Sequence, residues 1–348
     1  MENGKNNIND TNISNNKTME YYNVTKSIIN QTITEVDNDT KLEKEAKDLF
    51  RKAENKLKRR CCLYVLIHSK EERLIESCQL FKRAGDKYKL CNQWKRSGIC
   101  YENCALIKIR LKEKPTPFYK MAYDCYEKID IGNEAKYIFD KMNISLEKDK
   151  NFFQAAKNCE DLAIQKEIKN KYEEAMDLYF KSSYYYERDG KHENLKNEMK
   201  IKTAELMMKI EHEKASKEVP AILENVGIKY LNTPERENEA KELFGKAILS
   251  SVFFKETPNI GNILIDKYIK IDKSFLDSNI YKLCKGVINS MKSHDFKKLN
   301  DIIQQYKESF EIDQFMEDIL DKIIEKEKKN YNIKDSVSSD FNNNFEDN

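Results

Sequence analysis

The sequence predicts an all-α protein, built as an array of antiparallel helical hairpins that is followed by a C-terminal helical bundle. One observation behind this is the scarcity of helix breakers, because 348 residues include only 9 Gly and 5 Pro. A second is the high charge, since 35% of residues are Asp, Glu, Lys or Arg. Long helices with solvated faces have this composition, whereas turn-rich β folds and glycine-loop nucleotide folds do not.

The elements follow from the chain in order. Residues 1–40 are rich in Asn and have few apolar residues, which predicts a disordered extension. From residue 41 to 329, apolar residues recur at i, i+3, i+4 and i+7, as in the stripe from Tyr172 to Ser183 and in Ile312 to Ile324. Short polar loops at 130–133, 189–192 and 233–237 separate the helices. Residues 330–348 are predicted to be a disordered acidic tail.

Aromatic residues that precede small or basic ones repeat along residues 41–274. Phe81 and Tyr126 are 45 residues apart, and Phe139 and Tyr179 are 40 apart. This spacing is typical of tetratricopeptide-like helix-turn-helix repeats, whose hairpins stack into a twisted sheet of antiparallel helices. From Phe275 to residue 329 the apolar pattern is denser and loses the repeat, which predicts the C-terminal bundle.

Motifs for catalysis are not found. The sequence has no phosphate-binding loop, no H-E-x-x-H and no G-x-S-x-G, and its four His are not spaced as metal ligands. Cys100 and Cys104 lie one helical turn apart, where two small buried side chains are the simpler interpretation. The net charge of +2 gives no general attraction to nucleic acid. We therefore expect a binding protein, not an enzyme, that has no cofactor, no metal and no nucleic-acid partner.

A basic run followed by an apolar segment interrupts the pattern of amphipathic helices and short polar loops. Lys56–Arg60 leads into seven apolar residues, which are Cys61, Cys62, Leu63, Tyr64, Val65, Leu66 and Ile67. The segment is too short to span a bilayer, but a loop over 61–68 could enter the membrane interface while the bases meet anionic headgroups. The alternative is a segment buried against the array. Paired Cys beside bases would also allow S-palmitoylation.

Several stretches resemble the soluble NSF attachment protein family, and most of all its alpha members. They are Ala53–Lys58, Ser77–Ala84, Lys89–Trp94, Phe153–Lys157, Leu178–Tyr186, Phe275–Ser278 and Asp313–Phe315. Their order and spacing resemble the family from about Glu45 to Lys329. The resemblance implies an adaptor with no catalysis of its own. Members of the family bind assembled SNARE complexes, of syntaxin-type and partner helices, and recruit the hexameric AAA ATPase NSF, which takes those complexes apart in vesicle traffic.

The resemblance also implies which residues contact each partner. Lys157 matches a family lysine that faces the SNARE bundle, and Lys196 and Lys200 flank a second such position, at Glu198. Family acids that engage the ATPase fall here on Asn289, Lys292 and Ser293. Asp313, Glu317 and the tail residue Phe345 are the candidates to recruit the ATPase in their place. The apolar loop would hold the adaptor on the membrane.

The charge distribution fits this expectation. Residues 41–70 hold ten bases and four acids, while residues 331–348 hold one base and four acids. We expect a cytoplasmic protein, bound peripherally to membranes, with a basic start and an acidic end. The alternative is a generic tetratricopeptide-like scaffold that binds peptides or subunits of a complex.

Overall fold

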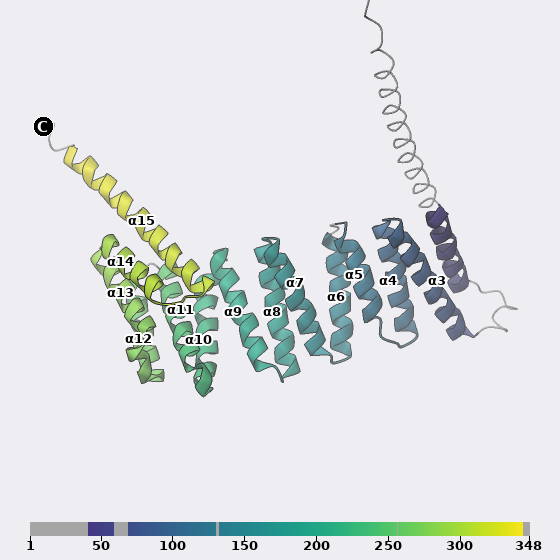
Figure 1. Cartoon of the computed structure of the whole chain (residues 1–348), viewed down its shortest axis with the longest axis horizontal. Coiled ribbons are helices and arrows are strands. Elements are labelled where there is room, and N and C mark those ends of the chain that lie inside the picture. The colour runs from purple at the N-terminus through teal and green to yellow at the C-terminus, as the bar shows by residue number, and fades with distance from the viewer. Residues whose placement is uncertain (1–40, 59–68, 130–131, 256, 344–348) are drawn as a thin grey trace, which may run out of the picture. The chain divides into compact units, whose positions relative to one another are not determined.

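The structure is a computed structural model that describes residues 41–58, 69–129, 132–255 and 257–343. These residues form helices joined by short turns, with no strand in the described ranges. The chain divides into two compact units, Met1–Lys150 and Asn151–Asn348. The prediction of an all-α fold is therefore confirmed (Figure 1).

In the first unit, each helix packs on the next in the chain. The unit contains a helix over residues 41–58, α3 (Lys70–Leu90), α4 (Trp94–Arg110), α5 (Thr116–Glu127) and α6 (Gly132–Lys148). Small side chains let neighbouring helices approach, and Ser77 Oγ donates to the Ala53 carbonyl at 2.9 Å. Ser97 Oγ donates to the Gly85 carbonyl at the same distance. Each such bond satisfies a buried hydroxyl at a helix crossing.

The second unit continues this pattern and then closes into a bundle. Its elements are α7 (Phe152–Ile168), α8 (Tyr172–Asp189), α9 (Glu193–Lys209), α10 (Ala215–Leu231), η1 (Pro234–Arg236), α11 (Glu237–Lys255), α12 (Pro258–Ile271), η2 (Lys273–Asp277), α13 (Asn279–Ser293), α14 (Phe296–Ser309) and α15 (Gln314–Asn343). Helix α11 is buried almost all round, because it contacts α10 as well as α12, α13 and α15. The last helices of the array, α10 and α11, thus share one core with the bundle. The predicted start of the bundle, at Phe275, falls in η2.

Aromatic rings fill the core where α11, α12 and η2 meet. Phe244 stacks on Tyr268 with ring centroids 4.4 Å apart, and Phe275 meets both rings edge-on. Tyr268 also donates its hydroxyl to Glu224 at 3.0 Å, so its polar end is satisfied. This cluster fixes the last helices of the array against the first of the bundle.

Five turns between helices share one hydrogen-bond pattern. In each, the first or second residue after the helix end has positive φ; these residues are Asn92, Lys112, Asn170, Glu211 and His294. At the first, the Gln93 amide donates to the Tyr88 carbonyl and the Asn92 amide to the Lys89 carbonyl. These are the two bonds of a Schellman cap, a position that usually takes glycine. A glycine-poor chain ends its helices here with other residues.

Helix α15 differs from the sequence prediction. Disorder was expected from residue 330, whereas α15 continues to Asn343. Residues 314–343 contain no Gly or Pro, so no breaker ends the helix there. Lys326 donates to the Phe253 carbonyl at 2.8 Å, and Lys322 pairs with Glu211 at 2.5 Å. These bonds hold α15 against α11 and the end of α9. The predicted extension over 1–40 lies outside the described residues.

Candidate functional site

Lys157 lies on α7 with its side chain about one third exposed. Its ammonium group donates to Glu160 at 2.9 Å, one turn later on the same helix. The Tyr186 hydroxyl of α8 donates to the other oxygen of Glu160 at 2.6 Å. Glu160 therefore holds Lys157 in place at the surface, while part of the lysine remains open to solvent. This geometry suits a positioned positive charge.

Lys196 does not lie open at the surface. It sits in the first turn of α9 and is 6% exposed, with its ammonium group 2.5 Å from Glu193 and 3.7 Å from Glu187. Glu193 also accepts from Lys229 at 2.7 Å, which ties α9 to α10. Burial opposes the charge of Lys196, but Glu193 outweighs this effect and raises the pKa of Lys196 above its ordinary value. This lysine joins helices together.

Lys200 lies one turn after Lys196 on α9 and is half-buried. It has no ion-pair partner among the residues that the structure describes. The two lysines share a side of α9, yet only Lys200 keeps an unpaired charge. Of the three lysines predicted to face a partner, the structure thus leaves Lys157 and Lys200 accessible.

The predicted membrane segment, Cys61–Ile67, lies outside the described residues. The helices that precede and follow it in the sequence, over residues 41–58 and α3, are joined by an ion pair between Lys56 and Glu76. Ser69 caps the start of α3, since its hydroxyl accepts from the Glu72 amide at 3.0 Å. No helix in the described ranges is both long and apolar enough to cross a bilayer.

The acids predicted to recruit an ATPase are engaged within the bundle. Asp313 accepts from the Met316 amide at 2.8 Å, which caps α15, and it forms an ion pair with the buried Lys246. Glu317 lies 3.8 Å from the ammonium group of Lys307. Both carboxylates therefore contribute to packing α15 onto its neighbours. Phe345 lies outside the described residues.

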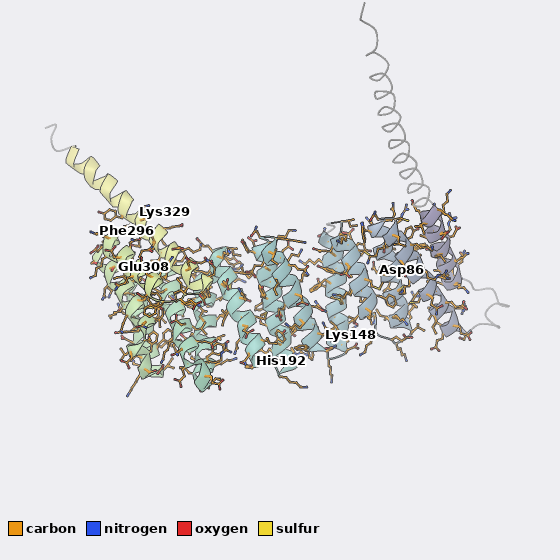
Figure 2. The ribbon with its side chains drawn as sticks, viewed as in Figure 1. Asp86, Lys148, His192, Phe296, Glu308 and Lys329 are labelled. Atoms are coloured by element: carbon orange, nitrogen blue, oxygen red, sulfur yellow. The ribbon has the colours of Figure 1, made fainter. Side chains whose placement is uncertain are left out.

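A basic surface at the opposite end of the bundle was missed by sequence reasoning. We call it the α13–α15 lysine patch, and it consists of Lys292, Lys297, Lys298, Lys328 and Lys329, which are all exposed. Phe296 of α14 and Tyr331 of α15 stack with centroids 6.1 Å apart, which brings the two halves of the patch together. Figure 2 shows Phe296 and Lys329 at this end. The halves are 30 residues apart in sequence, so only the hairpin geometry unites them.

Two cysteines of the array, Cys78 and Cys100, have shifted pKa values and are buried. Burial raises the pKa of Cys100 to about 12, so its thiol stays protonated near neutral pH. A hydrogen bond from the Cys104 thiol lowers the pKa of Cys78 below its ordinary value, but Cys78 is buried in the core between α3 and α4. Among the described residues, no three His, Cys, Asp or Glu side chains gather as metal ligands.

Taken together, a stacked helical array, a fused C-terminal bundle and positioned surface charges define a class of binding scaffold. The family model of the soluble NSF attachment protein, SNAP, matches residues 44–328, which cover both the array and the bundle. The chain belongs to this family.

Curated relatives align along most of their length. A beta-soluble NSF attachment protein of Bos taurus is 24% identical over 289 residues, which cover 80% of this chain and 92% of the relative. The alpha-soluble NSF attachment protein of Homo sapiens is 23% identical, covering 82% and 95%. A plant relative, the alpha-soluble NSF attachment protein of Vitis vinifera, is 21% identical, covering 77% and 90%.

Proposed function

We propose that this protein is an adaptor that binds assembled SNARE complexes at a membrane surface and recruits an NSF-type ATPase to take them apart. The observation that carries this proposal is the family match over residues 44–328, because one family model matches the array and the bundle together. A generic peptide-binding scaffold would need only the array. The adaptor has no catalytic step of its own, so the ATPase supplies the energy.

Lys157 and Lys200 are the residues we assign to the SNARE-facing side. Both are at least partly exposed, and Glu160 limits the side-chain freedom of Lys157. A lysine that is already positioned loses less entropy when it meets an acidic surface. Lys196 supports this side indirectly, by fixing the start of α9 against α10 through Glu193.

Membrane attachment is assigned to Cys61–Ile67. The helix over residues 41–58 and α3 are joined by the Lys56–Glu76 ion pair and by the Ser77–Ala53 hydrogen bond. These contacts hold together the two helices that flank the segment in the sequence. A weak SNARE binder that is held on the same bilayer as its target gains effective concentration without any new contact.

The test is reconstitution. Liposomes that carry an assembled SNARE complex would be mixed with the full chain and the NSF-type ATPase of the same organism, and ATP-driven disassembly would be followed by fluorescence dequenching. We expect disassembly to need the chain, the ATPase and ATP together. If the chain neither binds the complex nor supports disassembly, the proposed function is wrong, and a generic scaffold becomes the better explanation.

A further inference from the structure

We propose that Cys78 and Cys104 form a redox-sensitive pair, which a peroxide converts to a disulfide that links α3 to α4. The two residues belong to one core cluster of the first unit and lie on neighbouring helices. In a reducing compartment such a bond forms only transiently, so it acts as a switch and not as a permanent cross-link. Neither residue takes part in the adaptor function proposed above, so the test is independent of that function.

The two thiols already contact each other. Cys104 Sγ donates to the Cys78 carbonyl oxygen at 3.3 Å, and the Cys104 thiol also hydrogen-bonds the Cys78 thiol. Another buried thiol of this unit, Cys125, is directed to oxygen instead, because its Sγ atom donates to the Ser97 hydroxyl at 3.3 Å. Cys78 and Cys104 are therefore placed to react with each other.

Small side chains bring α3 and α4 close enough for a cross-link. Further along the same helix crossing, the Ser97 hydroxyl donates to the Gly85 carbonyl at 2.9 Å. A Cβ atom placed on Gly85 would lie 3.1 Å from the Cβ atom of Cys100. Disulfides join Cβ atoms that are about 3.5–4.5 Å apart, so the spacing of the two helices at this point is no larger than a disulfide needs.

The surroundings of the two thiols give them different roles. The Cys104 hydrogen bond and, to a smaller extent, the Lys108 ammonium group lower the pKa of Cys78, although burial opposes both effects. The same hydrogen bond and burial raise the pKa of Cys104. Cys78 is 5% exposed and Cys104 is 0% exposed, so a small oxidant reaches Cys78 first. Cys78 is thus the thiol that meets the oxidant, and Cys104 is the thiol that closes the disulfide.

The reaction balances with hydrogen peroxide as the two-electron oxidant. The Cys78 thiolate attacks one peroxide oxygen, the O–O bond breaks, and the released hydroxide takes up a proton to become water. The Cys104 sulfur then attacks the sulfenic acid on Cys78, the S–O bond breaks, and the Cys104 proton leaves with the hydroxyl as a second water. A dithiol such as dithiothreitol reverses the product to two thiols by exchange.

The cross-link stiffens the first helices of the chain. It joins residues that are 26 apart in sequence, and closing a loop of this length removes entropy from the unfolded chain. The same core cluster includes Ala53 and Leu57 of the helix over residues 41–58, which precedes Cys61–Ile67 in the sequence. Oxidation should therefore make this part of the array more resistant to unfolding.

The experiment compares the oxidised and the reduced full chain. Wild type, Cys104→Ala and the control Cys100→Ala are treated with hydrogen peroxide, free thiols are alkylated, and the monomer is digested with trypsin without reduction. Cys100 is the matched control because it lies one helical turn from Cys104 and is also 0% exposed. Mass spectrometry then detects any cross-link between the tryptic peptides 74–82 and 97–108. The second peptide contains both Cys100 and Cys104, so the two variants assign the bond.

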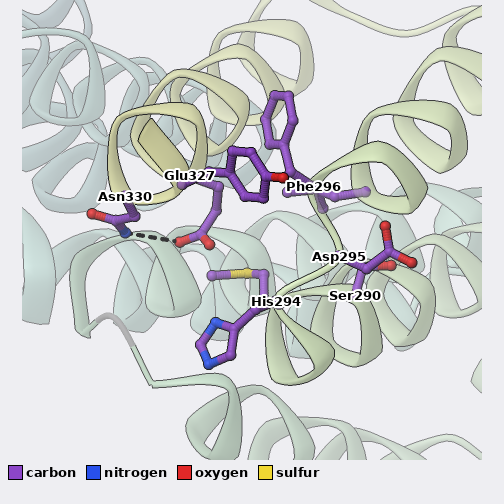
Figure 3. A pocket seen from close by; sticks show the side chains of 9 residues that line it. Ser290, His294, Asp295, Phe296, Glu327 and Asn330 are labelled. Carbon is purple, nitrogen blue, oxygen red and sulfur yellow. Dashed lines mark hydrogen bonds between the residues drawn. The ribbon is translucent and has the colours of Figure 1, made fainter. Parts of the chain in front are cut away.

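Peroxide also oxidises methionine, and reversal separates the two reactions. Met291 lines a hollow between α13, α14 and α15 and is 8% exposed (Figure 3). Its sulfoxide would place a polar group in an apolar contact and destabilise the bundle, and methionine sulfoxide reductases are needed to remove it. A Tm that rises on oxidation and falls again with dithiothreitol therefore reports the disulfide.

We expect the linked peptides in wild type and in Cys100→Ala, but not in Cys104→Ala. Oxidised wild type should unfold about 5–10 °C above reduced wild type by circular dichroism, and dithiothreitol should reverse the rise. Linked peptides that are absent from wild type, or that persist in Cys104→Ala, would overturn the pairing, and an unchanged Tm would overturn the stiffening. If Cys104→Ala does not fold, Cys100→Ala still decides, because a bond from Cys78 to Cys100 would be lost in that variant.

Discussion

Two lysines of similar sequence context should respond to the same substitution in opposite ways. Lys157 and Lys196 both follow a helix start and both lie beside a glutamate, yet one is about one third exposed and the other is buried. Replacement by Met keeps the aliphatic stem and removes the charge. We expect Lys196→Met to lower stability with little effect on SNARE binding. We expect Lys157→Met to weaken SNARE binding with little effect on stability.

The magnitude follows from the partners of each lysine. Removing one member of a buried ion pair costs about 3–5 kcal/mol when the other charge is left buried. Glu193 and Glu187 are each more than half exposed, and Glu193 keeps Lys229, so neither carboxylate is stranded. We therefore expect about 1 kcal/mol, or a fall in Tm of about 2–4 °C for a unit of this size.

For Lys157, a single positioned charge at the edge of an interface contributes about 1 kcal/mol, which is about a fivefold change in Kd. Its own loss barely affects the fold, because Glu160 retains the Tyr186 hydroxyl. The assays are thermal unfolding by circular dichroism and titration against an assembled SNARE complex. If Lys196→Met weakened SNARE binding at an unchanged Tm, the assignment of Lys196 to the fold would be refuted.

Three further outcomes can be checked. Lys112→Gly should raise the Tm of the first unit by up to about 2–4 °C because Lys112 has a φ of 58°, whereas the control Lys114→Gly should not. Cys100 has a pKa of about 12 in the folded protein and about 9 in the unfolded chain, so the free energy of unfolding should fall as pH rises above about 9. Cys100→Ala should make this dependence of the unfolding free energy on pH less steep by about 1.4 kcal/mol per pH unit, measured by urea titrations at several pH values. Leu63→Ser/Tyr64→Ser should slow disassembly on liposomes but not with SNARE complexes lacking membrane anchors; equal slowing in both would make the segment structural.

Helical periodicity was enough to predict the helices themselves. The stripe from Tyr172 to Ser183 corresponds to the buried side of α8, and Phe315 to Ile323 to the buried side of α15. An exception within the first stripe is Phe180, which is 64% exposed. Apolar spacing measures which side of a helix is buried on average, and one ring at the edge of the stripe does not change that average.

Helix ends were harder to predict, for a physical reason. The usual sign of a helix end is Gly in the left-handed position, and Gly190 after α8 is such a case. Elsewhere Asn, Lys, Glu and His occupy this position, as at Asn92, Glu211 and His294. These residues are common inside helices of this chain, so their presence in the sequence marks no boundary.

The surface sites show where sequence reasoning stops. A lysine-rich sequence contains many candidate contacts, and their meaning depends on which carboxylate each one reaches in space. Lys246 and Asp313 are 67 residues apart yet form a pair, while Lys298 and Lys329 have no carboxylate partner among the described residues. The net charge of the sequence does not distinguish a paired lysine from an unpaired one. Only the packing of α11, α14 and α15 separates charges that hold the bundle together from charges left for a partner, and it is the second group that can give an adaptor its specificity.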